Sequence, residues 1–249
     1  MSMHLADHKG DFLIFASLAK ALDVPLTNDE SVALTQCEIS PGLYRRYPEI
    51  KVPEESRSDI SRDGYLGVLL SILLGPEADR NRRLDDIINV CIKTRCQVGE
   101  VGKKGYTNIW PIFPLFLAAR YGSWVPTLPL IAVPSFKVSY KGEEMESPSS
   151  QEGFRAHLMA LMILIEYETG KVGIGSRWTM EKLVDKNPNN PWFIALDVLV
   201  HDRMMIRKLT TIRKAIETLP DGKLSGTGWG GCPNEVLKAL AVYTMKRCT

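Results

Sequence analysis

A short polar cluster stands directly before one of the most apolar stretches of this chain. Ser61, Arg62 and Asp63 precede the run 64–74, and Gly75-Pro76 follows it. Serine is a good N-cap, an aspartate in the first turn is favoured by the helix dipole, and a Gly-Pro pair ends a helix. The sequence therefore predicts a buried helix up to Leu74 with two charged residues at its start. Placing charges at the edge of a core costs free energy, so these residues are candidates for a functional or a structural role.

Helical spacing of apolar residues recurs along most of the chain. It predicts further helices over residues 12–22, 82–96, 109–121, 154–169, 178–184, 192–209 and 233–245. The segment 154–169 is apolar nearly all round, which is typical of a helix at the centre of a domain.

Two segments interrupt this helical pattern. Residues 24–62 are rich in prolines and predict a long ordered loop with room for one short helix. Alternating and β-branched residues around Lys141-Gly142 allow one short β-hairpin within 128–145. We therefore expect an all-α fold of about seven or eight helices with at most one short β-hairpin, in a single domain spanning residues 1–249.

The charge balance argues against a nucleic-acid partner. The chain carries 31 basic and 29 acidic residues, a net charge of +2, whereas proteins that bind nucleic acid or anionic membranes are usually strongly basic. Arg80, Arg82 and Arg83 form a local basic run, for which a solvated helix face is favoured over a phosphate-binding patch. We expect no nucleic-acid partner.

The chain shows no pattern of a membrane or export segment. Its start, MSMHLADHKG, lacks a basic region followed by a long apolar stretch, so we expect no signal peptide. The apolar runs 67–74 and 158–165 are far shorter than the roughly 20 residues of a spanning helix. We expect a soluble protein without membrane insertion.

The cysteines and histidines form no recognised metal or redox motif. The five cysteines are irregularly spaced, and Cys91 and Cys96 do not match a CxxC pair, so we expect free, mostly buried thiols in a reducing compartment. His4 and His8 have the spacing of a metal pair, but no nearby carboxylate completes a site. The sequence predicts no metal and no cofactor.

One pattern resembles a known group of proteins. It consists of Tyr44-Arg45-Arg46-Tyr47-Pro48, then Ser61-Arg62-Asp63 and Gly64-Tyr65-Leu66-Gly67, with Asn187-Pro-Asn-Asn-Pro-Trp-Phe later in the chain. In two patches the chain resembles helical proteins encoded by bacteriophages, which are similar to α/α-toroid folds with helical hairpins around a central cleft. Carbohydrate-active enzymes often use that architecture. Gly64 stands where the group usually has glutamine, so the role of that glutamine does not transfer.

Glycan cleavage requires two carboxylates, or one carboxylate with another polar group, around a cleft. Asp63 is the best candidate for a catalytic acid or base, with Arg62 as a clamp for substrate. Tyr44, Tyr106 and Trp110 are candidate platforms for stacking sugar rings. The alternative, which the pattern favours, is that Asp63 only stabilises the start of its helix.

The asparagine-rich turn has two interpretations. Asn187, Asn190 and Trp192 could line the same cleft and bind substrate. Asparagines at such positions more commonly cap turns and helices, and we favour that role. The glycine-rich segment 225–231 lacks the Lys-Ser/Thr of a P-loop, and the chain has no G-x-S-x-G elbow, so neither nucleotide binding nor a serine hydrolase is predicted.

The leading hypothesis is a phage-encoded structural or accessory protein of the virion or tail. Its partners would be other virion or host proteins, with a glycan as a further candidate, and its location would be the virion or the host cytoplasm. The alternative is a glycan-binding or glycan-cleaving protein, a polysaccharide hydrolase or lyase that uses Asp63. A third option is an intracellular phage protein that binds a host protein.

Overall fold

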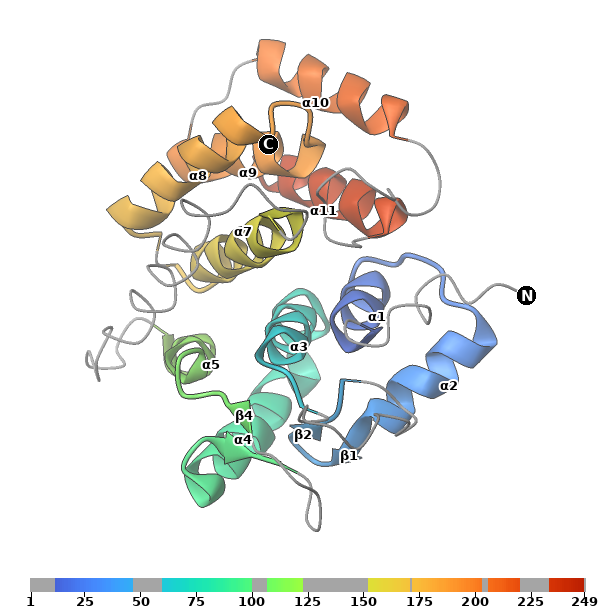
Figure 1. The fold of residues 1–249 in the computed structure, drawn as a ribbon, viewed down its shortest axis with the longest axis vertical. Coiled ribbons are helices and arrows are strands. Elements are labelled where there is room, and N and C mark those ends of the chain that lie inside the picture. Colours follow the sequence, from blue (N-terminus) through green and yellow to red (C-terminus); the bar gives the residue numbers. More distant parts are fainter. Residues whose placement is uncertain are drawn as a thin grey trace.

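The structure is a computed structural model that describes residues 12–46, 60–99, 107–122, 152–170, 172–202, 206–219 and 233–248. In these ranges the chain forms ten α-helices and two antiparallel sheets of two strands each (Figure 1). The all-α class expected from the sequence is therefore confirmed. None of the helices in these ranges is long and apolar enough to cross a membrane.

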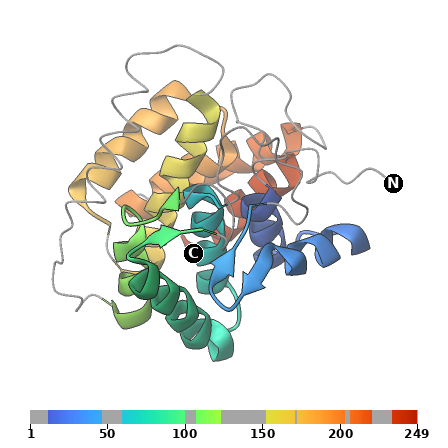
Figure 2. The same cartoon turned by 60° about the horizontal axis from the view of Figure 1, so that its bottom comes forward.

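The helices occupy most of the described chain. In chain order they are α1 (Phe12–Ala21), α2 (Asn28–Cys37), α3 (Arg62–Leu74), α4 (Glu77–Thr94), α5 (Phe113–Tyr121), α7 (Glu152–Glu168), α8 (Ile174–Lys186), α9 (Pro191–His201), α10 (Ile206–Thr218) and α11 (Asn234–Arg247). The strands are β1 (Glu38–Ser40), β2 (Leu43–Tyr44), β3 (Gln97–Val98) and β4 (Thr107–Asn108). β1 pairs with β2 and β3 with β4, and both sheets lie at the end of the molecule that carries α4, away from α10 (Figure 1 and Figure 2).

Two glycines allow α1 and α3 to pack closely. A Cβ atom added to Gly67 would lie 2.6 Å from the Cα atom of Ile14, and one added to Gly64 would lie 2.9 Å from the side chain of Leu13. A residue without a side chain is required where another backbone approaches so closely. Gly64 and Gly67 therefore lie on the face of α3 that contacts α1.

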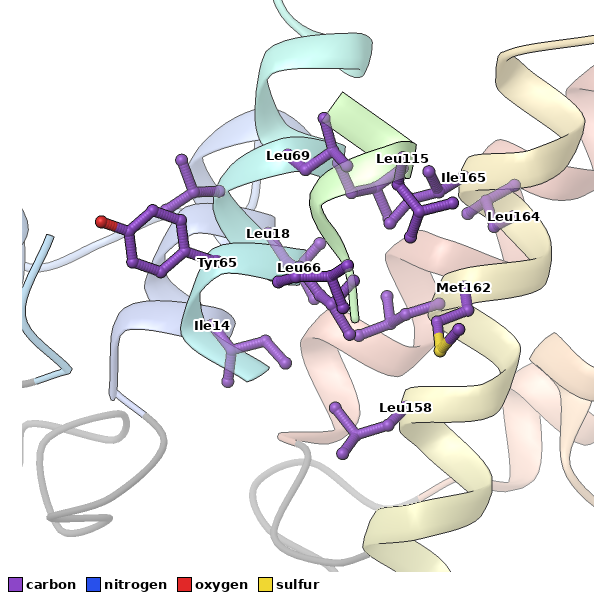
Figure 3. Close-up of a cluster of buried hydrophobic side chains, with 14 of the residues drawn as sticks. Ile14, Leu18, Tyr65, Leu66, Leu69, Leu115, Leu158, Met162, Leu164 and Ile165 are labelled. Carbon is purple, nitrogen blue, oxygen red and sulfur yellow. The ribbon is translucent and has the colours of Figure 1, made fainter. Parts of the chain in front are cut away.

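The centre of the molecule is filled by apolar side chains from α1, α3, α5 and α7. Every residue of α7 from 158 to 165 is buried, which confirms that this helix is central. In Figure 3, Leu66 and Leu69 of α3, Leu115 of α5 and Ile165 of α7 belong to one cluster. The elements at the centre meet in a packed core. A ring of helical hairpins around an open cleft remains a prediction.

Helix α9 is buried on nearly all sides. Trp192 and Phe193 belong to the main core, whereas Ile194 and Val198 form a second, smaller cluster with Ile212 of α10. Its contacts with α7, α8, α10 and α11 make α9 the central element of the C-terminal half.

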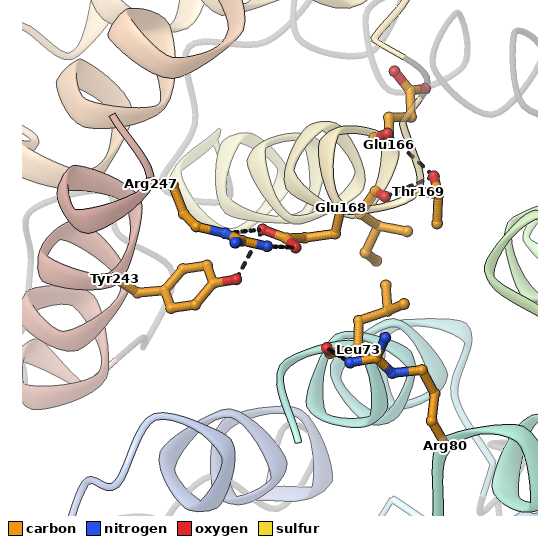
Figure 4. A network of polar contacts seen from close by, with 8 residues as sticks. Leu73, Arg80, Glu166, Glu168, Thr169, Tyr243 and Arg247 are labelled. Atoms are coloured by element: carbon orange, nitrogen blue, oxygen red, sulfur yellow. Dashed lines mark hydrogen bonds and ion pairs between the residues drawn. The ribbon is translucent and has the colours of Figure 1, made fainter. Parts of the chain in front are cut away.

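Polar contacts join the C-terminal helix to the central one (Figure 4). Tyr243 of α11 donates a hydrogen bond of 2.8 Å to Glu168 of α7, and Arg247 pairs with the same carboxylate at 2.5 Å. Burial and the Glu168 carboxylate raise the pKa of the Tyr243 phenol, and the hydrogen bond to Glu168 raises the pKa of Arg247. A further hydrogen bond in the same view joins Arg80 to the Leu73 carbonyl oxygen, across the junction of α3 and α4.

The predicted ends of α3 and the start of α11 are correct, whereas α4 begins at Glu77 instead of residue 82 and α5 at Phe113 instead of residue 109. Ser61 is the N-cap of α3, with its Oγ atom 3.2 Å from the backbone nitrogen of Asp63, and α3 ends before Gly75. Pro233 precedes α11, and Pro114 lies in the first turn of α5, as expected for prolines at helix starts.

Several expectations about the bounds and number of the elements are corrected. Besides the one helix for which it had room, α2, the segment 24–62 contains the strands β1 and β2. Helix α8 is longer than the expected 178–184. The helix expected over 192–209 is divided into α9 and α10, because Asp202 has a left-handed conformation (φ 51°) that ends α9. The described residues hold two short sheets rather than one and ten helices rather than seven or eight, while the hairpin expected within 128–145 lies outside them.

Candidate functional site

The two candidate catalytic residues lie at the start of α3. Ser61 accepts hydrogen bonds from the backbone N–H groups of Asp63 and Gly64, so its side chain satisfies two groups that the helix leaves unpaired. Asp63 lies in the first turn, where the helix dipole stabilises a carboxylate, and Arg62 is the first helical residue. Both side chains are half-buried, and neither lines the pocket described below.

Tyr44 is held in the core and does not offer a free ring face. Its hydroxyl group donates a hydrogen bond of 3.0 Å to Glu38, and its ring meets Tyr65 edge-on, with the centroids 5.8 Å apart. Burial, and then the nearby Glu38 carboxylate, raise the pKa of the Tyr44 phenol to about 12, while the charge of Arg83 acts in the opposite direction. The phenol is thus a neutral hydrogen-bonding group.

The other aromatic candidate that the structure describes, Trp110, does not line the pocket with Tyr44. Trp110 is 45% exposed and stacks on Phe113, with the ring centroids 5.9 Å apart. Tyr106 lies outside the described residues.

The asparagine-rich turn caps helices, as favoured from the sequence. The Asn190 side chain accepts hydrogen bonds of 2.9 and 3.1 Å from the backbone N–H groups of Trp192 and Phe193 at the start of α9. The Asn187 side chain donates one of 2.9 Å to the Leu183 carbonyl oxygen at the end of α8. Trp192 is fully buried beside His157 of α7, with ring centroids 5.0 Å apart, so its indole faces the core.

The candidates from the sequence therefore lie in separate parts of the molecule. Asn190 and Trp192 begin α9 in the C-terminal half, whereas Tyr44 ends β2 near α4 at the opposite end (Figure 1). The structure does not bring these residues together around one space.

A pocket lies beside Tyr44 among the described residues. It has a volume of about 710 Å³ and lies between α1, α2, the end of α3 and the start of α4. Leu13, Leu34, Val68 and Leu74 contribute apolar side chains to its lining. Pockets that hold small ligands commonly have such a volume and combine apolar walls with a few polar groups.

The polar groups of this pocket are balanced in charge. Lys20 and Arg83 contribute cations, and Asp23 and Glu38 contribute carboxylates. With the Tyr44 phenol beside Glu38 and Arg83, the pocket offers both donors and acceptors of hydrogen bonds. This balance is suited to a polar ligand of low net charge.

Sequence reasoning missed most of this pocket. Of its polar residues, only Tyr44 was a candidate, and Arg83 was assigned to a solvated helix face. That assignment is correct for the neighbouring Arg82, which is 65% exposed and pairs with Asp79 at 3.3 Å. Arg83 is one helical step away and faces the pocket, a difference that depends on how α4 packs and not on the charge pattern.

The described side chains form no metal centre. No group of three or more histidine, cysteine, aspartate or glutamate residues among them could hold an ion. His201 lies between Asp197 and Glu181, at 3.0 and 3.3 Å, and links α8 to α9. This is a polar contact between helices, in which the buried imidazole is held by two acidic side chains.

Comparison with known proteins adds no relative to this picture: no protein-family model, curated protein or solved structure matches the chain. The functional argument therefore depends on the pocket and its residues.

Proposed function

We propose that this chain is a non-catalytic accessory protein that binds a short glycan in the pocket beside Tyr44. The observation that carries the proposal is the pocket itself, whose lining combines apolar side chains with charge-balanced polar ones, among them Glu38 and Arg83. Sugars present both C–H faces and hydroxyl groups, so they require apolar contact and hydrogen bonds from the same site. A phage-encoded protein of the virion or tail, as the sequence resemblance implies, would use such a site on a bacterial surface glycan.

Binding is favoured over cleavage because of where Asp63 lies. Glycosidases place their carboxylates at the bound sugar, with two such groups on opposite sides of one bond. Asp63 lies in the first turn of α3 and is not part of the pocket, and Glu38 is already hydrogen-bonded to Tyr44. This arrangement supports recognition of a ligand in the pocket rather than its cleavage by Asp63.

The binding test is an array of bacterial surface oligosaccharides, followed by calorimetry with any glycan that binds. We expect Arg83→Gln to weaken binding about tenfold or more, because a hydrogen bond to a charged group is lost. Arg82→Gln is the matched control, since its side chain lies on the exposed side of the same helix. The proposal is wrong if no glycan binds, or if both substitutions weaken binding equally.

Two further measurements separate the remaining alternatives. If the oligosaccharides are cleaved, and Asp63→Asn abolishes the cleavage, the chain is an enzyme and the binding role is secondary.

Mass spectrometry of purified virions tests the assignment to the particle: the chain should be present in stoichiometric amounts. Its absence there would contradict the virion assignment while leaving the glycan-binding result unaffected.

A further inference from the structure

Two cysteines meet where α4 ends. The backbone N–H group of Cys96 donates a hydrogen bond of 2.7 Å to the carbonyl oxygen of Cys91, five residues earlier. Arg95 and Cys96 both have positive φ angles, 52° and 60°. A hydrogen bond over five residues combined with a left-handed residue defines the Schellman motif, in which the side chains at the two ends of the bond come into contact.

In this motif the two contacting side chains are thiols. Cys91 and Cys96 are both buried, and their side chains hydrogen-bond to each other. That hydrogen bond raises the pKa of Cys91, which is also raised by burial, and lowers the pKa of Cys96. The backbone closure and the contact between the thiols show that the two sulfur atoms share one space.

Another buried cysteine among the described residues provides a contrast within the same protein. Cys37, at the end of α2, is also a buried free thiol, and burial raises its pKa to about 12. The charge of Arg45 opposes that shift. Burial alone therefore does not produce the paired state seen at Cys91 and Cys96.

We propose that Cys91 and Cys96 form an intramolecular disulfide when the folded protein meets a disulfide oxidant. The bond would fasten the last turn of α4 to the segment that begins β3. That segment is already joined to β4, because Ile109 donates a backbone hydrogen bond of 3.0 Å to the carbonyl oxygen of Cys96 and β3 pairs with β4. The disulfide would thus hold a helix end and a two-stranded sheet together.

The reaction is a thiol–disulfide exchange with a small disulfide such as oxidised glutathione. The Cys96 thiolate attacks one sulfur atom of the oxidant, forms a mixed disulfide and releases one thiolate. Cys91, deprotonated in turn, attacks the Cys96 sulfur atom of the mixed disulfide and releases the second thiolate. The two cysteines lose two electrons and two protons, and one oxidised glutathione becomes two molecules of the reduced form.

Access to the buried pair requires only a local opening. Lys93, Arg95 and Gln97 around the pair are exposed, and the ends of helices open at lower free energy than the rest of a domain. Small disulfides can therefore reach Cys96 without global unfolding.

The test is peptide mapping of the native protein after incubation with oxidised glutathione. Trypsin cleaves after Lys93 and Arg95, between the two cysteines, so the disulfide would join the peptides 84–93 and 96–103. We expect this linked pair without reductant and two separate peptides after reduction. Cys91→Ser should instead retain glutathione on Cys96, whereas Cys37→Ser should form the linked pair as the original protein does.

Two results would overturn the proposal. One is the absence of the linked pair in native protein under conditions that oxidise a reference dithiol. The other is a linked pair that forms only in denaturant, since this would show that the native contact between the thiols does not support exchange.

Discussion

The hydroxyl group of Tyr65 donates a hydrogen bond of 3.0 Å to the carbonyl oxygen of Gly42. It also accepts one of 3.2 Å from the backbone nitrogen of Tyr44, so a single side chain of α3 holds both the turn between β1 and β2 and the strand β2 that follows it. Gly42 in turn lies against α4, where an added Cβ atom would be 2.4 Å from the backbone carbonyl group of Asp86. This contact fixes the strand that presents Tyr44 to the pocket.

We expect Tyr65→Phe to destabilise the protein by about 1–3 kcal/mol, because it leaves a buried N–H group and a buried carbonyl group without their partner. The free energy of unfolding, measured by urea denaturation, gives the effect. Tyr121→Phe is the control, since Tyr121 is exposed and its substitution should change stability by less than about 0.5 kcal/mol. Equal effects of the two substitutions would contradict the role of the Tyr65 hydroxyl group.

The close approach of α1 and α3 predicts a large effect of a single methyl group. Gly67→Ala places a Cβ atom 2.6 Å from the Ile14 backbone and should cost about 1–3 kcal/mol. Gly175→Ala, in α8, meets no atom within 4 Å and should be neutral or slightly stabilising, because alanine favours helices. Thermal unfolding of the two variants compares them directly, and a stable Gly67→Ala variant would show that α1 and α3 can separate without cost.

The buried imidazole of His157 predicts a dependence of stability on pH. Burial lowers its pKa from 6.5 to about 3 in the folded protein. Between these values the unfolded chain binds more protons than the folded one, so the free energy of unfolding should decrease as the pH falls, by about 1 kcal/mol per pH unit from this group. The contribution is fully present above the unfolded value and decreases as the pH falls toward the folded one.

This pH dependence can be isolated by substitution. His157 lies between the rings of Phe15 and Trp192, where phenylalanine has a similar shape and no titrating group. Urea denaturation between about pH 4 and 7 should give a shallower slope for His157→Phe than for the original protein, by about 1 kcal/mol per pH unit. Parallel slopes would mean that His157 does not limit stability in acid.

The capping role of Asn190 is tested by two substitutions. Asn190→Ala removes the acceptor for the N–H groups of Trp192 and Phe193 and should destabilise the protein by about 1–2 kcal/mol. Serine is also a good N-cap, so Asn190→Ser should restore most of that stability. If both variants bind the glycan as the original protein does, Asn190 has a structural role alone. If both lose binding while their stability is unchanged, Asn190 contributes to the ligand site.

The sequence predicts those elements whose signals are local. The start of α3 at Ser61 and the cap at Asn190 depend on a few adjacent residues and were identified correctly. Helix α2 was expected only as one short helix at no stated position within 24–62, because few of its residues are buried and apolar periodicity is nearly absent. A local signal was nevertheless present, since Thr27 and Glu30 form a capping box, with the Thr27 nitrogen 2.9 Å from the Glu30 carboxylate.

The candidate site depends on contacts that no local pattern contains. The pocket combines Lys20 of α1, Glu38 of β1 and Arg83 of α4, which come from three separate parts of the chain. Whether Arg82 or Arg83 faces it is decided by the rotation of α4 in the fold. The same is true of Cys91 and Cys96, whose contact depends on the left-handed turn at the end of α4.

The position of α9 between two apolar clusters determines the order in which the structure opens. Ile212 of α10 covers the smaller cluster, whereas the other face of α9 is sealed by the main core. Detaching α10 exposes mainly that small cluster, so it costs less than separating α9 from α7. In amide hydrogen exchange, the amides of α10 should therefore exchange through a local opening of that helix. The amides of α9 should exchange more slowly, because they require the whole domain to unfold.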